Sequence, residues 1–173
     1  MKLTKLIETL NYPTDKSTLH SYIPIYDVLF EEFSDKQINF LEIGIQYGAS
    51  IKLWRDYFTK ATIFGYDIED KAEMFPEGAI KVIKDANLIS PTEFINNPLN
   101  IAIDDGSHTL TDQLNFVKNI YPQMADGGLL IIEDIQNIDQ QNNDFKTLNI
   151  PYTIIDLRNV QGRYDDVILI FRK

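Results

Sequence analysis

Two apolar runs that each end in acidic residues place the tightest constraint on the fold of this chain. The first covers residues 101–103 and leads into the sequence Asp-Asp-Gly-Ser-His at 104–108. The second covers residues 129–132 and leads into Glu-Asp at 133–134. Short, uninterrupted apolar runs rich in β-branched residues are typical of strands covered on both faces in a parallel sheet. Ligands bind at the carboxyl ends of such strands, so we expect both acidic groups to lie in one cleft.

Strand-like runs alternate with amphipathic segments along the rest of the chain. This alternation predicts an α/β fold with a doubly wound, mostly parallel sheet between two layers of helices. The predicted strands are 38–43, 61–66, 79–83, 99–103, 129–132, 152–157 and 167–171. The predicted helices are 2–10, 22–33, 49–58, a weak one from about Pro91, and 109–121, while 137–149 is expected to be a loop or a poor helix. The last two strands are too close for a crossover helix, so we expect them to pair antiparallel.

Length and composition limit the classes of protein. The 173 residues suit one domain, 1–173, with a helical segment at 1–35 before an α/β core at 36–173. The net charge is -10, from 16 basic and 26 acidic residues, which disfavours a nucleic-acid partner. There is no cysteine, residues 1–8 do not resemble a secretory signal, and no apolar run approaches the ~20 residues of a membrane span. We therefore expect a cytoplasmic protein with no membrane partner.

The acidic residues after the two central strands are candidate metal ligands. Asp105, Glu133 and Asp134 offer hard oxygen atoms, which suit magnesium or another divalent cation. His108 follows Asp105 closely, where a general base would be useful. The alternative is structural, because Asp-Gly and Glu-Asp after a strand also serve as turn and helix-capping residues, and His108 can be a turn residue.

A glycine-bearing turn joins the strand at 38–43 to the helix at 49–58. Gly44 allows a tight turn, Gly48 allows backbone to approach a ligand, and the amides that open the helix can hold an anionic group. The spacing is neither that of a dinucleotide-binding G-x-G-x-x-G motif nor that of a P-loop. Ordinary turn geometry is the alternative explanation.

Two further acids end the next strands. Asp67 follows the strand at 61–66, about where a carboxylate holds a ribose diol in α/β folds. Asp85, in the stretch 84–87, ends the strand at 79–83 and is placed to accept a bond from an exocyclic amine. The alternatives are a helix N-cap for Asp67 and a solvated turn acid for Asp85.

Several other residues have a structural interpretation beside a functional one. His20 is expected to be packed or satisfied within a turn, with the alternative that it covers the site. Asp15 and Lys16 are interpreted as turn residues. The aromatic residues Trp54, Tyr57 and Phe58 are expected in the core rather than in a substrate platform, and exposed aromatics on the helix at 22–33 would favour a homodimer or higher homo-oligomer.

Taken together, these motifs resemble those of class I S-adenosylmethionine-dependent methyltransferases, which have a Rossmann-like sheet. More narrowly, the chain resembles the metal-dependent sugar O-methyltransferases of macrolide and polysaccharide biosynthesis. The resemblance rests on Leu-Glu-Ile-Gly-x-x-x-Gly-x-Ser at 41–50, Thr-Asp-Lys-x-x-x-His-x-Tyr at 14–22, Trp-x-x-Tyr-Phe at 54–58, and the two acidic segments. It covers residues 11–172.

The resemblance implies a role for each candidate residue. Asp105, Glu133 and Asp134 would bind a divalent metal, usually Mg²⁺, and His108 would be the general base for a sugar hydroxyl. S-adenosylmethionine would be held by residues at the strand ends and the glycine turn: Glu42, Gly44, Gly48, Ser50, Asp67, Asp85, Ala86 and Asp104. The acceptor would be a small molecule or a glycan.

Three alternatives remain beside this interpretation. A catechol-type acceptor is compatible with the same chemistry, because a metal in an acidic cluster suits any adjacent diol. A non-catalytic domain that keeps the methyltransferase fold as a binding or assembly module is the main alternative of another class. A metal-dependent oxygenase is disfavoured, because the sequence lacks two histidines and a carboxylate in the H-x-D/E…H spacing.

Overall fold

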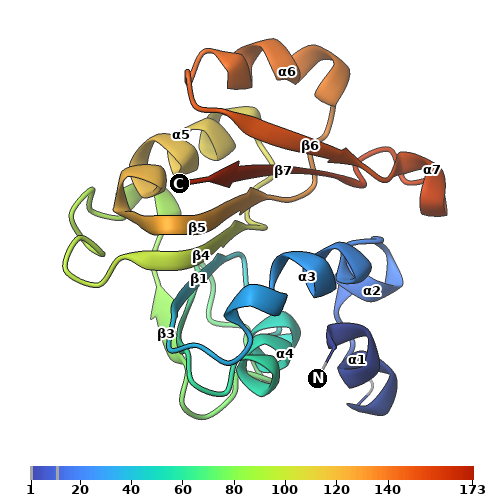
Figure 1. The fold of residues 1–173 in the computed structure, drawn as a ribbon, viewed down its shortest axis with the longest axis vertical. Helices are drawn as coiled ribbons and strands as arrows, with labels where there is room; N and C mark the ends of the chain where they lie inside the picture. Colours follow the sequence, from blue (N-terminus) through green and yellow to red (C-terminus); the bar gives the residue numbers. More distant parts are fainter. Residues whose placement is uncertain (1, 11) are drawn as a thin grey trace.

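A computed structural model describes residues 2–10 and 12–173 of the chain. Within that part, seven strands form one sheet in the order β3-β2-β1-β4-β5-β7-β6 (Figure 1). The strands are β1 (Asn39–Ile43), β2 (Thr62–Asp67), β3 (Ile80–Ile83), β4 (Leu99–Asp104), β5 (Met124–Ile132), β6 (Tyr152–Asp156) and β7 (Val167–Arg172). All pairs are parallel except those of β7, which runs antiparallel to both β5 and β6. The predicted fold class is confirmed.

Helices cover both faces of the sheet. The first face packs against α1 (Leu3–Leu10), α3 (Ile23–Leu29) and α4 (Ala49–Tyr57), and the second packs against α5 (Leu110–Ile120) and α6 (Ile138–Lys146). Short helices α2 (Asp15–Thr18) and α7 (Arg158–Gln161) lie in connections, with 3-10 turns at Glu31–Phe33, Ala86–Leu88 and Tyr121–Gln123. Successive residues of a strand point to opposite faces, so the apolar runs of β1 and β4 supply both halves of the core.

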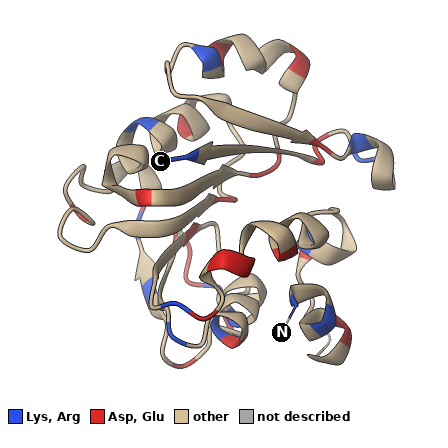
Figure 2. Ribbon diagram, viewed as in Figure 1, with Lys and Arg blue, Asp and Glu red and all other residues tan. Residues whose placement is uncertain are grey.

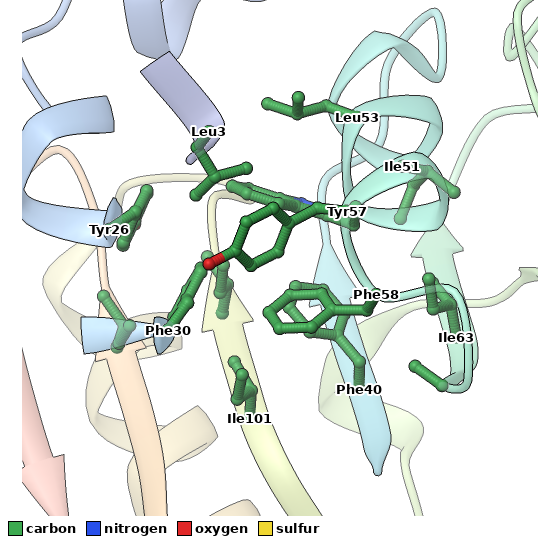
Figure 3. Packing of buried hydrophobic residues seen from close by; sticks show 14 of the residues in the cluster. Leu3, Tyr26, Phe30, Phe40, Ile51, Leu53, Tyr57, Phe58, Ile63 and Ile101 are labelled. Atoms are coloured by element: carbon green, nitrogen blue, oxygen red, sulfur yellow. The ribbon is translucent and has the colours of Figure 1, made fainter. Parts of the chain in front are cut away.

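Aromatic residues dominate the first half of the core. Phe30 of α3 stacks on Tyr26 with ring centroids 4.7 Å apart, and it meets Phe58 at 5.5 Å. Figure 3 shows these rings between α1, α3 and α4. Trp54 and Phe58 are fully buried, which confirms their expected place in the core. Because the aromatic residues of α3 are buried in the chain's own core, the exposed aromatic face that would have favoured a dimer is absent from the described part of this helix.

The segments that begin at Pro91 and at Asn137 differ from the sequence-based prediction. The weak helix from Pro91 is wrong: residues 91–96 form successive turns, because Pro98 follows too soon for a stable helix to nucleate. The stretch at 137–149 contains a regular helix, α6, which Asn137 caps by accepting a bond from the amide of Gln140. Buried Ile138 and Phe145 attach α6 to the sheet, so packing compensates for a polar composition.

The segment before β1 crosses the carboxyl ends of the central strands. The sequence Asn-Tyr-Pro-Thr-Asp-Lys at 11–16 predicts a turn. In the structure the short helix α2 begins at Asp15, so Asp15 and Lys16 are helical; Asn11 lies outside the described residues. Figure 2 shows acidic segments at several strand ends, on the side that faces α2 and α3. This arrangement brings residues 16–26 next to residues 104–134, which are remote from them in the sequence.

Candidate active site

A pocket of about 950 Å³ opens at the carboxyl ends of β1, β2, β3 and β4. Its lining contains most of the residues that the sequence singled out: Gly44, Ser50, Asp67, Asp85, Ala86, Asp104, Asp105 and His108. Four others lie outside its lining, namely Glu42, Gly48, Glu133 and Asp134. The strand ends therefore bring together two groups of residues, one facing the pocket and one buried behind it.

Asp67 organises the glycine turn. Its Oδ2 accepts bonds from the amides of Ile45 and Gln46, at 3.0 and 2.9 Å, and its Oδ1 accepts one from the amide of Glu69 at 2.9 Å. Gly44 has a φ of 81°, which a residue with a side chain rarely adopts. Asp67 thus stabilises the glycine turn through these hydrogen bonds and also lines the pocket.

The segment at 74–75 packs closely against Gly48. Gly48 has a φ of 86°, and a Cβ atom there would lie 2.9 Å from the amide nitrogen of Phe75. The close approach at this glycine is therefore to the segment 74–75 rather than to the pocket.

Glu42 does not line the pocket, although it contacts Ser50, which does. It is fully buried, and its Oε2 accepts bonds from Ser50 Oγ at 2.8 Å and from Trp54 Nε1 at 3.2 Å. Burial raises the pKa of this carboxyl group, and Lys16 opposes the rise. Glu42 is therefore part of the buried group, and it meets the helix α4 that follows the glycine turn.

Asp104 and Asp85 face the pocket in different environments. Asp104 is buried, its Oδ1 accepts a bond from the amide of Gly106 at 3.2 Å, and burial raises its pKa to about 7. Asp85 is exposed and accepts a bond from the amide of Asn87 at 2.9 Å, so it caps the 3-10 turn after β3. Both residues line the pocket in addition to making these local hydrogen bonds.

Asp105, His108 and Asp134 form a cluster at the end of the pocket. Each offers one ligand atom, and these atoms lie within 4.8 Å of one another. His108 and Asp134 both have positive φ values, 56° and 54°, which is uncommon for residues other than glycine. Among the described residues, nothing bonds to the buried Nδ1 of His108. A nitrogen and carboxylate oxygens so arranged fit a divalent cation.

Glu133 is not part of that cluster. Its Oε2 accepts a bond from Lys16 Nζ at 2.6 Å, and its Oε1 accepts one from the hydroxyl of Tyr26. Burial raises the pKa of Glu133 to about 8, with Lys16 acting in the opposite direction. Of the three predicted metal ligands, the structure places Asp105 and Asp134 together and joins Glu133 to a lysine.

Lys16 is the residue of this site that sequence reasoning missed. It is fully buried, and its Nζ lies 2.6 Å from Asp105 Oδ2, 2.6 Å from Glu133 Oε2 and 3.3 Å from Glu42 Oε1. These carboxylates raise the pKa of Lys16 well above its usual value, although burial alone would lower it. The only indication of a functional role for Lys16 in the sequence was its place in the motif at 14–22. A lysine next to a turn gives no indication that its side chain is buried.

Other side chains of the N-terminal segment reach Asp134. The hydroxyl of Tyr22 donates to Asp134 Oδ1 at 2.6 Å, and His20 Nδ1 lies 3.4 Å from the same oxygen. His20 is buried and its ring stacks on Tyr22, with centroids 4.8 Å apart. The expectation of a packed histidine is confirmed, and its position holds it against a candidate metal ligand.

Several curated proteins are similar to this chain in sequence. The demethylmacrocin O-methyltransferase of Streptomyces fradiae is 33% identical over 138 residues, which cover 73% of this chain and 35% of that protein. The 8-demethyl-8-alpha-L-rhamnosyl tetracenomycin-C 2'-O-methyltransferase of Streptomyces olivaceus is 30% identical over 138 residues, covering 73% of this chain and 36% of that protein. The chain thus spans about a third of the length of these curated relatives. No protein-family model matches it.

Solved structures support the same relationship at the level of the fold. The MycE methyltransferase from the mycinamycin biosynthetic pathway, in complex with Mg and SAH, superposes with a TM-score of 0.75 at 24% identity. The superposition covers 99% of this chain and 55% of that one. A second MycE structure, which also contains mycinamycin VI, gives a TM-score of 0.75 at 23% identity and covers 99% of this chain and 53% of that one.

The strand order, the glycine turn and the acids at the strand ends define a class I S-adenosylmethionine-dependent methyltransferase fold. Within that class, this chain is related to the sugar O-methyltransferases that act in macrolide biosynthesis. The resemblance noted from the sequence motifs is confirmed. Across residues 2–10 and 12–173, no helix has the length and apolar character that a membrane crossing requires.

Proposed function

We propose that this protein transfers a methyl group from S-adenosylmethionine to a sugar hydroxyl of a glycosylated small molecule or a glycan, with the help of a divalent cation. The observation that carries the proposal is the cluster of Asp105, His108 and Asp134 at the end of a pocket formed by a methyltransferase fold. A methyl donor in the pocket would lie beside a candidate metal site and an imidazole.

The relatives support the choice of acceptor. The names of two curated relatives describe O-methylation of rhamnosyl compounds. A third relative is the mycinamicin VI 2''-O-methyltransferase of Micromonospora griseorubida. MycE structures contain Mg and SAH. We extend both features to this chain, with Mg²⁺ as the proposed ion.

The proposed cofactor seat uses the pocket-facing residues. Asp67 would hold the ribose hydroxyls, Asp85 and Ala86 would lie beside the adenine, and Gly44 and Asp104 would lie beside the methionine portion. Ser50, near the start of α4, lines the same pocket. Glu42 and Gly48 would support this seat from behind, because neither lines the pocket.

The proposed metal ligands are Asp105, Glu133 and Asp134, with His108 beside them. Asp105 and Asp134 already lie together with His108, and both Asp105 and Glu133 would have to share their carboxylates with Lys16. When bound there, the cation would acidify and orient a sugar hydroxyl, and two adjacent hydroxyls would chelate it best.

The proposed proton acceptor is His108. In the transfer, the bond between the methyl carbon and the sulfonium sulfur breaks and its electron pair returns to sulfur. A new bond forms between that carbon and the hydroxyl oxygen, and the hydroxyl proton passes to a nitrogen of His108. Imidazole suits this role, since its ordinary pKa is near ~6.5. A pocket that held the two reactants in line would supply much of the rate enhancement.

Calorimetric titration of S-adenosylmethionine, with and without Mg²⁺, tests the proposal. We expect micromolar binding by the unmodified protein and loss of binding in Asp67→Ala, because Asp67 both faces the cofactor and fixes the glycine turn. Asp70→Ala is the matched control: Asp70 is an exposed acid that pairs with Lys81 outside the pocket lining. Absence of binding to the unmodified protein would refute the methyltransferase assignment. Equal losses in both variants would remove Asp67 from the cofactor seat.

A further inference from the structure

The side chain of Lys16 occupies the centre of the buried acidic group. Its ammonium has three hydrogens, and three carboxylates surround it: Asp105 and Glu133, each at 2.6 Å, and Glu42 at 3.3 Å. The side chain is fully buried, so these carboxylates take the place of water around the charge.

The surrounding charges do not cancel. Glu42, Asp105, Glu133 and Asp134 are all near the ends of β1, β4 and β5, and Lys16 is the cation that contacts three of them. His20 and His108 are the other basic side chains recorded within 4.0 Å of these acids, both against Asp134. With the acids ionised, the group therefore keeps an excess of negative charge, which favours an added cation.

Asp105 belongs to two sets of contacts at once. It binds Lys16 through Oδ2, and it contributes to the cluster with His108 and Asp134. Glu133, the third proposed ligand, is also bound by Lys16. A divalent ion at the proposed site would therefore bind carboxylates that are already paired with Lys16. The positive charge of Lys16 would also repel the ion, and the buried surroundings screen this repulsion poorly.

We propose that Lys16 is a built-in counterion that sets how tightly the divalent cation binds, by competing with it for the carboxylates of Asp105 and Glu133. Lys16 is thus a positioning residue: it keeps the two carboxylates close together before the metal enters, and it limits the affinity of the site. The inference rests on the metal assignment made under the proposed function, and it adds a residue of the N-terminal segment to the metal site.

The test is a titration with Mn²⁺ alone, at pH 8 and without cofactor, in which free Mn²⁺ is followed by its paramagnetic resonance signal. Lys16→Met keeps the length of the side chain and removes the charge, and we expect it to bind Mn²⁺ at least about tenfold more tightly than the unmodified protein. Lys60→Met is the matched control, because Lys60 is an exposed lysine that pairs with Asp35 away from the site. We expect the control to stay within about twofold of the unmodified protein.

Folding of the variant provides a second measurement. Removing Lys16 leaves three buried acids without their partner. We therefore refold Lys16→Met with and without Mg²⁺ and compare the two samples by circular dichroism. A variant that folds only with the ion supports the proposal, because the ion then replaces the lysine charge. A variant that stays unfolded at saturating Mg²⁺ overturns it.

The remaining outcomes separate this inference from the proposed function. Unchanged or weaker Mn²⁺ binding by folded Lys16→Met overturns the inference and leaves the metal site in place. Failure of both proteins to bind Mn²⁺ removes the metal assignment together with the inference, while the cofactor titration still reports on the methyltransferase assignment independently.

Discussion

Gly44 and Asp105 touch backbone to backbone: a Cβ atom at position 44 would lie 2.0 Å from the carbonyl oxygen of Asp105. The two residues follow neighbouring parallel strands, and the amide of Asp105 donates to the carbonyl of Ile43 at 3.0 Å. The glycine turn of the proposed cofactor seat and the first acid of the proposed metal site are therefore fixed to each other. A change at either position should affect both.

Gly44→Ala should lower the free energy of unfolding by about 3 kcal/mol or more, because it adds a backbone clash to the strain of a positive φ. Gly78→Ala is the control, since Gly78 has a φ of 81° but nothing within 4 Å of the added carbon. Urea unfolding of both variants should show the larger loss at Gly44. Equal losses would mean that the turn moves away from Asp105 at little cost.

His108→Ala should lower the rate of methyl transfer by about 10²-fold or more, the usual contribution of a positioned general base. The affinity for S-adenosylmethionine should stay nearly unchanged, because the proposed cofactor contacts lie elsewhere in the pocket. Turnover assays and calorimetry on the same preparation separate the two effects. Retained turnover would exclude His108 as the base.

Asp134→Asn should weaken Mn²⁺ binding by at least about tenfold, because the variant loses the charge of a ligand that belongs to both the predicted set and the observed cluster. Asp126→Asn, at an exposed acid of β5, should leave the affinity unchanged. The Mn²⁺ titration described above measures both. A similar weakening in the two variants would indicate a general charge effect rather than ligation.

Asp112 should contribute stability that depends on pH. Its carboxylate accepts bonds from Ser107, Asn87 and Thr109, which hold its pKa below the ordinary value. A lowered folded-state pKa adds stability that is present above the unfolded-state pKa, near ~3.9, and is lost as the pH falls through the folded-state value.

The comparison of unfolding free energies between the unmodified protein and Asp112→Asn checks this expectation. The difference should be constant from pH 7 to about pH 5 and should shrink below about pH 4. A difference that does not change with pH would show that the amide replaces the carboxylate in these bonds without loss.

The central strands of the sheet were well predicted because they are buried on both faces, so each appears in the sequence as an apolar run. Helix α5 was also predicted, and the structure shows that Thr109 caps it by accepting a bond from the amide of Asp112. Helix α6 could not be predicted with confidence from its composition, because its stability depends on burying Ile138 and Phe145 against the sheet.

Some residues of the candidate site could likewise be predicted from the sequence, and others could not. Acids at the ends of adjacent parallel strands must meet, so the pocket-facing residues Asp67, Asp104 and Asp105 were open to prediction from the sequence. Which of the acids face the pocket and which are buried behind it depends on the face of each strand and on its partners. Glu42 and Glu133 are held in the buried group by Ser50 and Lys16.

The sequence by itself therefore determined the class of fold, the edge of the sheet that carries the site, and the acidic character of that edge. Only the tertiary structure placed Lys16 among those acids, 117 positions before Glu133, and turned Tyr22 towards Asp134. The physical reason is the range of the signals. Strand patterning is local and repeats within a few residues, whereas a buried ion pair is created by the packing of segments that are far apart in the chain.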